Sequence, residues 1–453
     1  MSEKELPQGW AWAKVGDVAG SAGLFCDGDW VETKDQDPNG EVRLIQLADV
    51  GDGAFLDKSA RYMTTRRANE LSCTYLRSGD VLVSRMADPI ARACIFPSLD
   101  RRCVTVVDVA IVRPGAHVDR RWLMHAINAP PFRVSAEGAA SGTTRARISR
   151  ANLGELSLPL PPLAEQLRIV AKLDELLARS RRAREVLAEV PALLERYRQS
   201  VLARATANGA APQVKLRTVV ENLDQGWSPQ CEPEAVGADD AWAVIKTTAV
   251  QPLYFDDAQN KRLPSNLLPR PHLEIAAGDV LITRAGPRAR AGICCHVPAV
   301  RPKLMVCDKV YRLRVREDLV LPAYLALALN EPGTLRRIDA LKSGISESGV
   351  NMTQEKLLEL DIKLPPLPIQ RHVVAAADDG ERRARSLRAT LDSVVDDIDR
   401  LDRSTLTRAF RGQLVPQDPN DEPASVMLEC IRAERAAGDG AATKRGRRAK
   451  AER

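Results

Sequence analysis

Several features are scarce in this sequence of 453 residues, and their scarcity argues against whole classes of protein. The nine cysteines never stand in a C-x-x-C pair and the five histidines are scattered, so we predict no zinc site. No uncharged apolar run approaches the length of a membrane span, and the opening MSEKELPQGW lacks the apolar core of a signal peptide. Because the chain is large and its cysteine count is odd, we expect a reduced, cytoplasmic protein.

Motifs of nucleotide chemistry are also missing. The sequence has no P-loop, which argues against ATP hydrolysis, and no Gly-rich turn after a strand to cradle a cofactor. NAPPF at 128–132 is similar to the Asn-Pro-Pro-aromatic motif that holds a flipped adenine. An alanine interrupts it, however, and the matching NEPGT at 330–334 has no aromatic ring. We interpret both segments as helix ends and predict that the chain is not an enzyme.

The net charge of +6 is small for a chain of this size. The last 22 residues hold eight basic and three acidic side chains, a net of +5, so the rest of the chain is close to neutral. A nucleic-acid surface would therefore have to be a local patch. The basic tail suits nonspecific DNA contact and a solubilising role equally well.

The most informative feature is a repeat of the first half of the chain in the second half. RSGDVLVSRMADPIARACIF at 77–96 corresponds to AAGDVLITRAGPRARAGICC at 276–295. LPLPPLAEQLRIV at 158–170 returns as IKLPPLPIQRHVV at 362–374. The matched features keep the same order, so the repeating unit is a whole domain of roughly 200 residues and not a short solenoid repeat.

Each copy begins as a globular domain and ends as a long helix. The first part mixes short alternating apolar runs with Gly and Pro breaks and a few helical patches, which indicates an α+β domain. Each Pro-Pro then opens a helix-forming segment. We predict a first globular domain at 1–157, a long helix at 158–207, a second globular domain at 208–361, a second long helix at 362–415 and a basic, disordered tail at 416–453.

Apolar or small residues recur at alternating spacings of four and three along both helices, the pattern of a coiled-coil seam. In the first helix these positions are Ile169, Leu173, Leu176, Ser180, Ala183, Leu187, Val190, Leu194, Tyr197 and Val201. In the second they are Val373, Ala377, Gly380, Ala384, Leu387, Leu391, Val394, Ile398, Leu401 and Thr405. A lone amphipathic helix is more often a core helix, but two seams that each follow a copy of one domain favour mutual pairing. Pro191 should kink the first helix.

Antiparallel pairing of these helices would make them a spacer between two similar α/β domains related by a pseudo-two-fold axis. Each seam would span about 48 Å at about 1.5 Å per residue. A fixed separation suits a partner with its own repeat, and B-DNA has one of about 34 Å. The same spacer would also serve to join two proteins.

These residues resemble the specificity subunit of type I restriction-modification systems. The resemblance rests on the duplicated order of GDVLVSR and GDVLITR, the SGTTRARIS segment, PLPPLAEQLRIV and LPPLPIQRHVV, and AFRGQLV at 409–415. It covers nearly the whole chain apart from the basic tail. It implies two target recognition domains that each read one half of a bipartite DNA sequence, with a paired-helix spacer that fixes the gap.

The resemblance also implies the partners. They are double-stranded DNA, two adenine-N6 methyltransferase subunits that use S-adenosylmethionine, and the restriction (translocase) subunits that use ATP and Mg²⁺. This chain itself would hold no cofactor. The second copy departs from the pattern, because it has SGISESGVN where the first copy has the basic SGTTRARIS.

Basic and amide residues near turns of the globular domains are the candidate DNA contacts. Arginine suits both phosphate contact and bidentate pairing with guanine, and an amide or lysine at a matched strand end suits base edges. The candidates are Gln46, Arg85, Arg92, Arg145, Arg147, Lys246, Arg284, Arg288 and Arg290. For each of them, the alternative is a surface ion pair.

A scaffold that binds only proteins remains the alternative for the whole chain. Such a scaffold would lack salt-dependent affinity for DNA. Outside the GDV and helix signals the two halves differ widely, which favours the reading of two different short DNA sequences.

Overall fold

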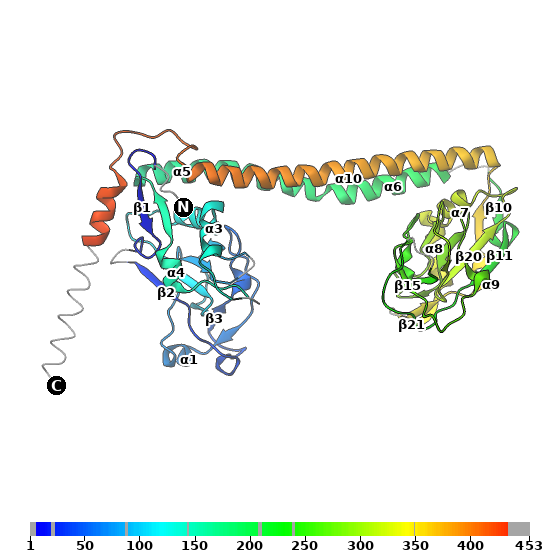
Figure 1. The fold of residues 1–453 in the computed structure, drawn as a ribbon, viewed down its shortest axis with the longest axis horizontal. Helices are drawn as coiled ribbons and strands as arrows, with labels where there is room; N and C mark the ends of the chain where they lie inside the picture. The colour runs from blue at the N-terminus through cyan, green and yellow to red at the C-terminus, as the bar shows by residue number, and fades with distance from the viewer. Residues whose placement is uncertain are drawn as a thin grey trace. The chain divides into compact units, whose positions relative to one another are not determined.

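The computed structural model describes residues 6–19, 23–86, 89–142, 145–206, 211–237, 241–347 and 349–433. The chain divides into two compact units (Figure 1). Unit 1 consists of Met1–Val186 and Ser393–Arg453, and unit 2 of Leu187–Asp392. Each long helical segment therefore contributes to both units, whereas the predicted boundaries treated the helices as separate elements.

The core of unit 1 is a four-stranded antiparallel sheet with apolar clusters on both faces. Its strands, in spatial order, are β2 (Leu24–Asp27), β8 (Val109–Arg113), β5 (Val81–Ser84) and β6 (Ala93–Ile95). The run VLVS of β5 is fully buried, because alternate residues point to opposite faces. Val81 and Val83 join the cluster that contains helix α2, and Leu82 joins the cluster on the other face.

Smaller sheets and helices complete unit 1. A three-stranded sheet has the order β4 (Tyr62–Met63), β3 (Val42–Ile45) and β7 (Cys103–Thr105), with β3 and β7 parallel. Strand β1 (Ala11–Lys14) pairs with β9 (Ser157–Leu160). The helices are α1 (Thr65–Glu70), α2 (Arg120–Asn128), α3 (Pro130–Gly138) and α4 (Arg150–Glu155), with short 3-10 turns η1 (Thr33–Asp35) and η2 (Leu47–Asp49).

Unit 2 repeats this topology. Its four-stranded sheet has the order β11 (Val220–Gln225), β20 (Val310–Val315), β16 (Val280–Thr283) and β18 (Cys294–His296). Its three-stranded sheet has the order β15 (Asn260–Arg262), β12 (Ala243–Ile245) and β19 (Leu304–Met305), again with one parallel pair, and β10 (Gln213–Lys215) pairs with β23 (Asp361–Lys363). The helices are α7 (Pro322–Leu329), α8 (Pro332–Leu341) and α9 (Gln354–Leu358), with 3-10 turns η3 (Leu216–Thr218), η4 (Thr247–Ala249) and η5 (Pro271–Leu273).

Two further small sheets belong to unit 2. Strand β13 (Val250–Gln251) pairs with β14 (Tyr254–Phe255), and β22 (Gly349–Asn351) lies between β17 (Ala285–Gly286) and β21 (Ser343–Ser346). Unit 1 has single bridges at the corresponding places, Val50 with Phe55 and Arg147 with both Met86 and Ser141. The duplication predicted from the sequence is therefore present in the strand order of both units.

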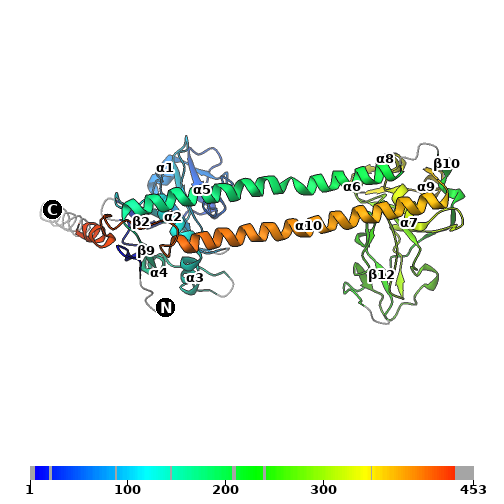
Figure 2. The same ribbon diagram turned by 90° about the horizontal axis from the view of Figure 1, so that it is seen from above.

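Three long helices follow the domains. They are α5 (Leu163–Ala188), α6 (Val190–Thr206) and α10 (Leu367–Ala409). The first predicted helix is broken at Glu189, two residues before Pro191, which confirms the predicted kink. In unit 1, α5 and the C-terminal part of α10 run side by side in opposite directions (Figures 1 and 2), since Ser180 donates to Asp402 at 2.6 Å while Leu173 shares a cluster with Phe410.

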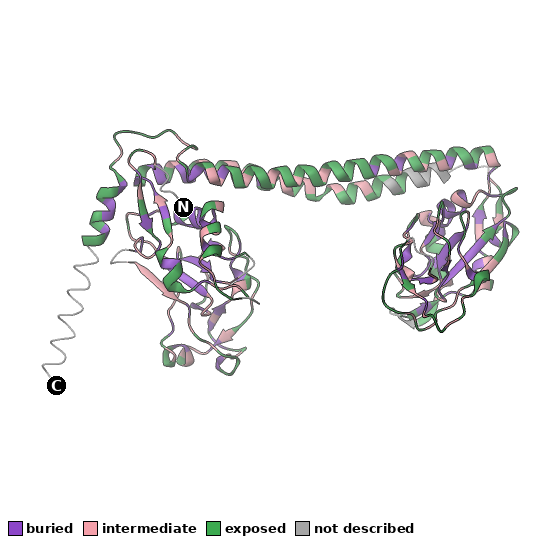
Figure 3. Ribbon diagram, viewed as in Figure 1, coloured by how far each residue is buried: buried purple, intermediate pink, exposed green. Residues whose placement is uncertain are grey.

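The seam of α10 differs from the predicted one. Leu387, Val394 and Leu401 are exposed by 53%, 38% and 60%. In unit 1 the polar Asp402 takes the inward position, where it receives a hydrogen bond from Ser180 and pairs with Arg184 at 2.7 Å. Figure 3 shows the contrast between this largely exposed helix and the buried strands. The apolar pattern alone did not identify these polar seam contacts.

The other predicted seam positions vary in burial. In the first helical segment Ile169, Leu173 and Ser180 are buried, Leu176, Ala183, Leu187, Val190 and Leu194 are half-buried, and Tyr197 is exposed by 39%. In α10, Val373, Gly380, Ala384 and Thr405 are buried, and Ala377, Leu391 and Ile398 are half-buried. The side chain of Val201 lies outside the described residues.

The prediction of a disordered tail from residue 416 is wrong for its first part. Residues 424–433 are helical, and the apolar cluster of unit 1 includes Met427, Leu428 and Ile431. Asp421 pairs with Arg168 at 2.6 Å. Burial of these apolar side chains orders a segment whose composition resembles that of a tail. Residues 434–453, which hold most of the basic charge, lie outside the described residues.

Candidate nucleic-acid interface

The repeated Gly-Asp-Val motif sets a turn and ties two strands together. Gly79 has a φ of +94°, which favours glycine. The Asp80 carboxylate receives the backbone N–H of Arg77 at 2.8 Å and the guanidinium of Arg113 at 2.6 Å. The equivalents in unit 2 are Gly278, Asp279, Ala276 and Arg314. The motif therefore holds the fold of each domain.

The Gln of the repeated Pro-Pro segment docks each long helix onto its domain. The Gln166 amide is fully buried. Its oxygen accepts from the backbone N–H of Asp119 at 2.8 Å, and its nitrogen donates to the Pro161 carbonyl at 3.1 Å. Gln370 repeats this arrangement with Leu321 and Pro365. The repeated signal thus fixes the start of each long helix against the N-terminus of α2 or α7.

The two matched asparagines lie at helix ends, as predicted. Asn128 is the last residue of α2, and its amide forms two hydrogen bonds with the backbone of Ala93, at 2.9 and 2.8 Å. Asn330 caps α7 and donates to the carbonyl of Cys294 at 2.9 Å. Both side chains are buried, and both form hydrogen bonds with backbone groups. This placement confirms that NAPPF is a structural segment.

Arg85 lies inside its domain. It is 4% exposed, and its guanidinium donates to the carbonyls of Val107 and Ile148 and pairs with Asp27 at 3.2 Å. Burial lowers the pKa of this guanidinium. These contacts argue against the predicted contact with DNA.

Arg284 is the half-buried counterpart of Arg85 in unit 2. Its guanidinium donates to the carbonyl of Asp308 at 2.7 Å and to the Asn351 amide oxygen at 2.8 Å. It also lies over the Tyr311 ring. A matched Arg after a matched strand has therefore kept a structural role in both units.

Arg92 and Arg290 close equivalent turns. The Arg92 guanidinium donates to the carbonyl of Val50 at 3.1 Å and to that of Leu47 at 3.5 Å. The Arg290 guanidinium donates to the carbonyls of Val250 and Thr247, both at 2.9 Å. Each arginine satisfies carbonyls at the end of a 3-10 turn, η2 or η4. Both are half-buried, which leaves little of either guanidinium for DNA.

The Thr-rich segment contains the most accessible predicted candidate. Arg145 is exposed. Arg147 is half-buried and pairs with Asp108 at 2.9 Å. In unit 2, Arg288 follows β17 and pairs with Asp339 at 3.1 Å and with Glu347 at 3.2 Å, and Glu347 belongs to the segment that corresponds to the Thr-rich one. Among the predicted arginines, Arg145 therefore remains the best placed to meet DNA.

Gln46 and Lys246 occupy matched positions, as predicted. Each is the half-buried residue directly before a 3-10 turn, at the end of β3 or β12. The Gln46 backbone N–H donates to the Asp49 carboxylate at 2.8 Å. Asp49 is fully buried, but donors from Ser59 and Lys58 outweigh the cost of burial and lower its pKa. These hydrogen bonds therefore hold in place the 3-10 turn η2, which follows Gln46.

Two exposed arginines of unit 1 escaped the sequence analysis. The Arg102 guanidinium carbon lies 3.6 Å from the centroid of the Tyr75 ring, and that of Arg101 lies 5.4 Å from the Tyr62 centroid. In unit 2, Arg270 lies over Trp227 at 4.2 Å. The adjacent basic pair directly before a strand was the available signal, but the aromatic partners are distant in sequence. Arginine stacked on an exposed ring is a common element of nucleic-acid surfaces.

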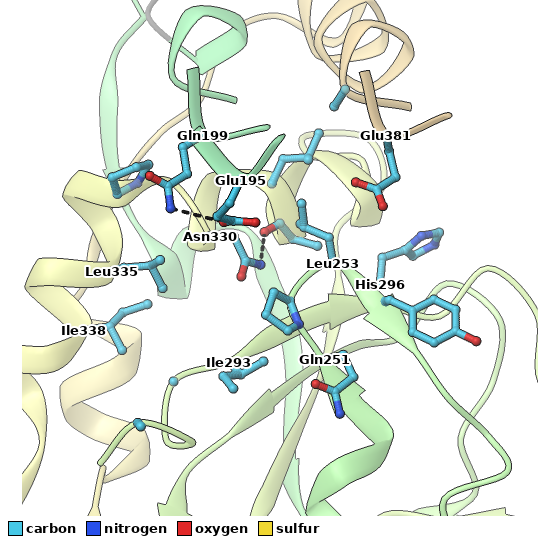
Figure 4. A pocket seen from close by; sticks show the side chains of 18 of the residues that line it. Glu195, Gln199, Gln251, Leu253, Ile293, His296, Asn330, Leu335, Ile338 and Glu381 are labelled. Atoms are coloured by element: carbon cyan, nitrogen blue, oxygen red, sulfur yellow. Dashed lines mark hydrogen bonds between the residues drawn. The ribbon is translucent and has the colours of Figure 1, made fainter. Parts of the chain in front are cut away.

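A groove of about 1530 Å³ lies within unit 2 (Figure 4). Glu195 and Gln199 of α6 line one side, Glu381 of α10 lines another, and Leu335 and Ile338 of α8 contribute apolar surface. Gln199 donates to Glu195 at 3.1 Å. The mixed apolar and charged lining is typical of a protein contact rather than of a catalytic pocket.

Within the described ranges, no group of three or more His, Cys, Asp or Glu side chains could hold a metal ion. No described helix combines the length and apolar character that crossing a bilayer requires.

Comparison with known proteins shows which proteins this chain resembles. No family model matches the chain. The specificity subunit of the type I restriction enzyme EcoKI from Escherichia coli K12 is 25% identical over 469 residues, which cover 97% of this chain and 98% of that protein. The EcoEI specificity subunit from Escherichia coli is 41% identical over 179 residues, which cover 40% of this chain but only 30% of that protein.

The chain is thus similar along nearly its whole length to a type I restriction enzyme specificity subunit. Solved structures share the fold of this chain. A chain from a study of the assembly and conformational transition of a type I restriction-modification system superposes with a TM-score of 0.69, at 22% identity, over 91% of this chain and all of that chain. The HsdS subunit from Thermoanaerobacter tengcongensis gives a TM-score of 0.55, at 22% identity, over 91% of this chain and 99% of that one.

Proposed function

We propose that this chain is a specificity subunit, which recognises a bipartite DNA sequence for a type I restriction-modification complex. The full-length similarity to the EcoKI specificity subunit carries the proposal. The duplicated topology supports it, because two copies of one domain suit the two halves of a bipartite target. The subunit itself is non-catalytic in this proposal, and it works in the cytoplasm, where the DNA is.

The recognition domains lie at 1–157 and 208–361 in this proposal, and α5, α6 and α10 form the spacer between them. Pairing of α5 with α10 in unit 1 supports the antiparallel arrangement. Deletion of one heptad from each helical segment removes about 10 Å. The preferred gap between half-sites should then shorten, or binding should be lost. An unchanged gap would show that the helices do not set it.

The partners in this proposal are duplex DNA, two adenine-N6 methyltransferase subunits and the restriction subunits. S-adenosylmethionine would bind to the methyltransferase, and ATP with Mg²⁺ to the restriction subunits. Exposed apolar residues of α10, such as Leu401, favour docking of a protein along the helices.

The role of the exposed Arg145 in phosphate contact stays a prediction. Four other predicted candidates have partly exposed side chains, and we propose that their exposed atoms contact the duplex. They are Gln46, Arg147, Lys246 and Arg288. The Arg284→Ala variant tests the alternative, because a structural role predicts loss of stability in unit 2, whereas a DNA role predicts weaker binding to one half-site alone.

Methylome sequencing of the source cell with and without this gene tests the central proposal. One bipartite motif should lose its N6-methyladenine when the gene is deleted. If no motif changes even after co-expression with the neighbouring methyltransferase, and DNA affinity does not depend on salt, the chain is a protein-binding scaffold instead.

A further inference from the structure

The start of β7 in unit 1 places two unpaired guanidinium groups beside aromatic rings. Arg101 and Arg102 are both exposed. Within the described part of the chain, neither guanidinium forms a hydrogen bond or ion pair, in contrast to those of Arg85, Arg92 and Arg290. The Tyr62 and Tyr75 rings hold them in place. An arginine that is positioned by stacking keeps its planar edge of N–H donors free for another acceptor.

The sheet fixes both rings and both arginines. Tyr62 on β4 pairs with Arg43 on β3, and Arg43 is also the register partner of Cys103, the first residue of β7. The Arg43 N–H donates to the Arg102 carbonyl at 3.0 Å. Because successive residues point to opposite faces, Arg101 and Arg102 lie on the two sides of this sheet end. The sheet end therefore presents a narrow ridge with a cation on each side.

A large aromatic surface belongs to the same part of unit 1. Trp30 is 69% exposed. Its neighbour Asp29 receives the N–H of Thr74 at 2.9 Å, directly beside Tyr75. The indole N–H of Trp30 donates to Glu32 at 3.2 Å, which leaves the faces of the ring open to solvent. Exposed aromatic and guanidinium groups together suit a nucleic acid, which offers phosphate charge and base edges.

Unit 2 lacks the ridge at the matching position. In unit 2, β12 has the same register as β3 in unit 1, since the Ala243 N–H donates to the Lys303 carbonyl at 3.0 Å. Lys303 therefore corresponds to Arg102, and its backbone N–H bonds to Glu274. The residue before it is Pro302. The backbone pairing of this sheet is therefore the same in both units, whereas the side chains at its end differ. Such a difference is expected if the two units read different half-sites.

We propose that Arg101 and Arg102 contact duplex DNA and read base edges in the half-site bound by unit 1, with Trp30 packed against the duplex beside them. This proposal rests on the proposed function and names residues that carry it out. A guanidinium fork pairs bidentately with the O6 and N7 atoms of guanine, so the half-site of unit 1 contains guanine opposite this ridge.

The experiment uses the specificity subunit assembled with its methyltransferase and the duplex that methylome sequencing identifies. Variants are Arg101→Ala with Arg102→Ala, Arg102→Lys, and Arg66→Ala as a matched control. Arg66 is an exposed arginine of the same unit that pairs only with Glu70 on its own helix. Affinity is measured for the cognate duplex, for duplexes mutated in one half-site at a time, and for unrelated DNA.

The double variant should bind the cognate duplex at least tenfold more weakly and should discriminate only the half-site of unit 2. Arg102→Lys should keep the affinity for unrelated DNA while it loses discrimination, because lysine has no planar fork. Arg66→Ala should stay within about twofold. Unchanged discrimination in the double variant overturns the proposal, and so does an equal loss on all sequences. If the wild-type complex neither methylates nor discriminates any DNA, the proposed function itself fails.

Discussion

Unit 1 and unit 2 share their strand order but few of their side chains, and the shared side chains have a common task. Asp80 and Asp279 cap the same turn, Gln166 and Gln370 dock the same helix start, and Asn128 and Asn330 close the same helix end. Each satisfies backbone groups that would otherwise be buried without a partner. Such groups cost ~1–3 kcal/mol when unpaired, which explains why these residues recur while their surroundings differ.

The units differ where a side chain meets other side chains or solvent. The buried Arg312 of β20 stands at the place of Ile111 in β8, and the exposed ridge of unit 1 has no copy in unit 2. Packing and surface chemistry have therefore changed within one backbone plan. Variants in which matched residues are exchanged or removed therefore test whether the stability of each unit depends on its own side chains.

The largest effect is expected from Arg312→Ala. Arg312 is 1% exposed, and its guanidinium bonds to Asp224 and to the carbonyls of His272 and Glu274. Its removal leaves a carboxylate and carbonyls without their donor, so unit 2 should lose about 3–5 kcal/mol of stability. Thermal unfolding checks this loss. Arg314→Ala removes a guanidinium that is 46% exposed and should cost under about 1 kcal/mol. Equal losses would contradict the buried role.

Acid should destabilise unit 1 through His125. Burial, followed by the charge of Arg121, lowers the pKa of His125 from 6.5 to about 4. Because the unfolded chain takes up the proton first, stability is present above pH ~6.5 and is lost as the pH falls towards 4, by at most about 3 kcal/mol. His125→Leu, which copies Leu327 of unit 2, should remove this part of the pH dependence. Stability curves at pH 7 and pH 4.5 test it, and an unchanged slope would refute it.

Gln166→Ala and Gln370→Ala should destabilise their own units by similar amounts, about 1–3 kcal/mol each. Each change leaves the backbone N–H of the N-cap residue, Asp119 before α2 or Leu321 before α7, without its acceptor. Hydrogen exchange at Asp119 and Leu321 reports the loss locally. Gln199→Ala, at an exposed position of α6, is the control and should stay within ~0.5 kcal/mol. A large loss in only one unit would mean that the docking is not equivalent.

The smallest effect is expected from Leu401→Ser, although the heptad pattern predicted a seam residue there. Its side chain is 60% exposed, so the free energy of unfolding should change by less than ~0.5 kcal/mol. Leu173→Ala on α5 removes a fully buried side chain of the same unit and should cost about 2–5 kcal/mol. Denaturant unfolding compares the two. If Leu401→Ser lowered the free energy of unfolding as much as Leu173→Ala does, Leu401 would be a seam residue as the heptad pattern predicted.

The amino-acid sequence was enough to predict the duplication, the mixed α and β character of each copy, the break near Pro191 and the helix ends at Asn128 and Asn330. These features depend on local backbone chemistry, which repeated Gly, Pro, Asn and Gln residues record directly. The family resemblance also came from the ordered repetition of such signals.

Which charged side chains are exposed could not be predicted from the sequence and depends on the folded structure. Arg85 and Arg102 are both arginines beside a strand, yet Arg85 is buried among carbonyls, whereas Arg102 is exposed and lies over the Tyr75 ring. Likewise, Leu401 and Asp402 exchanged their expected places, and residues 424–433 folded onto unit 1. Partners distant in the sequence set each of these outcomes, because hydrogen bonding and burial depend on which segments the fold brings together.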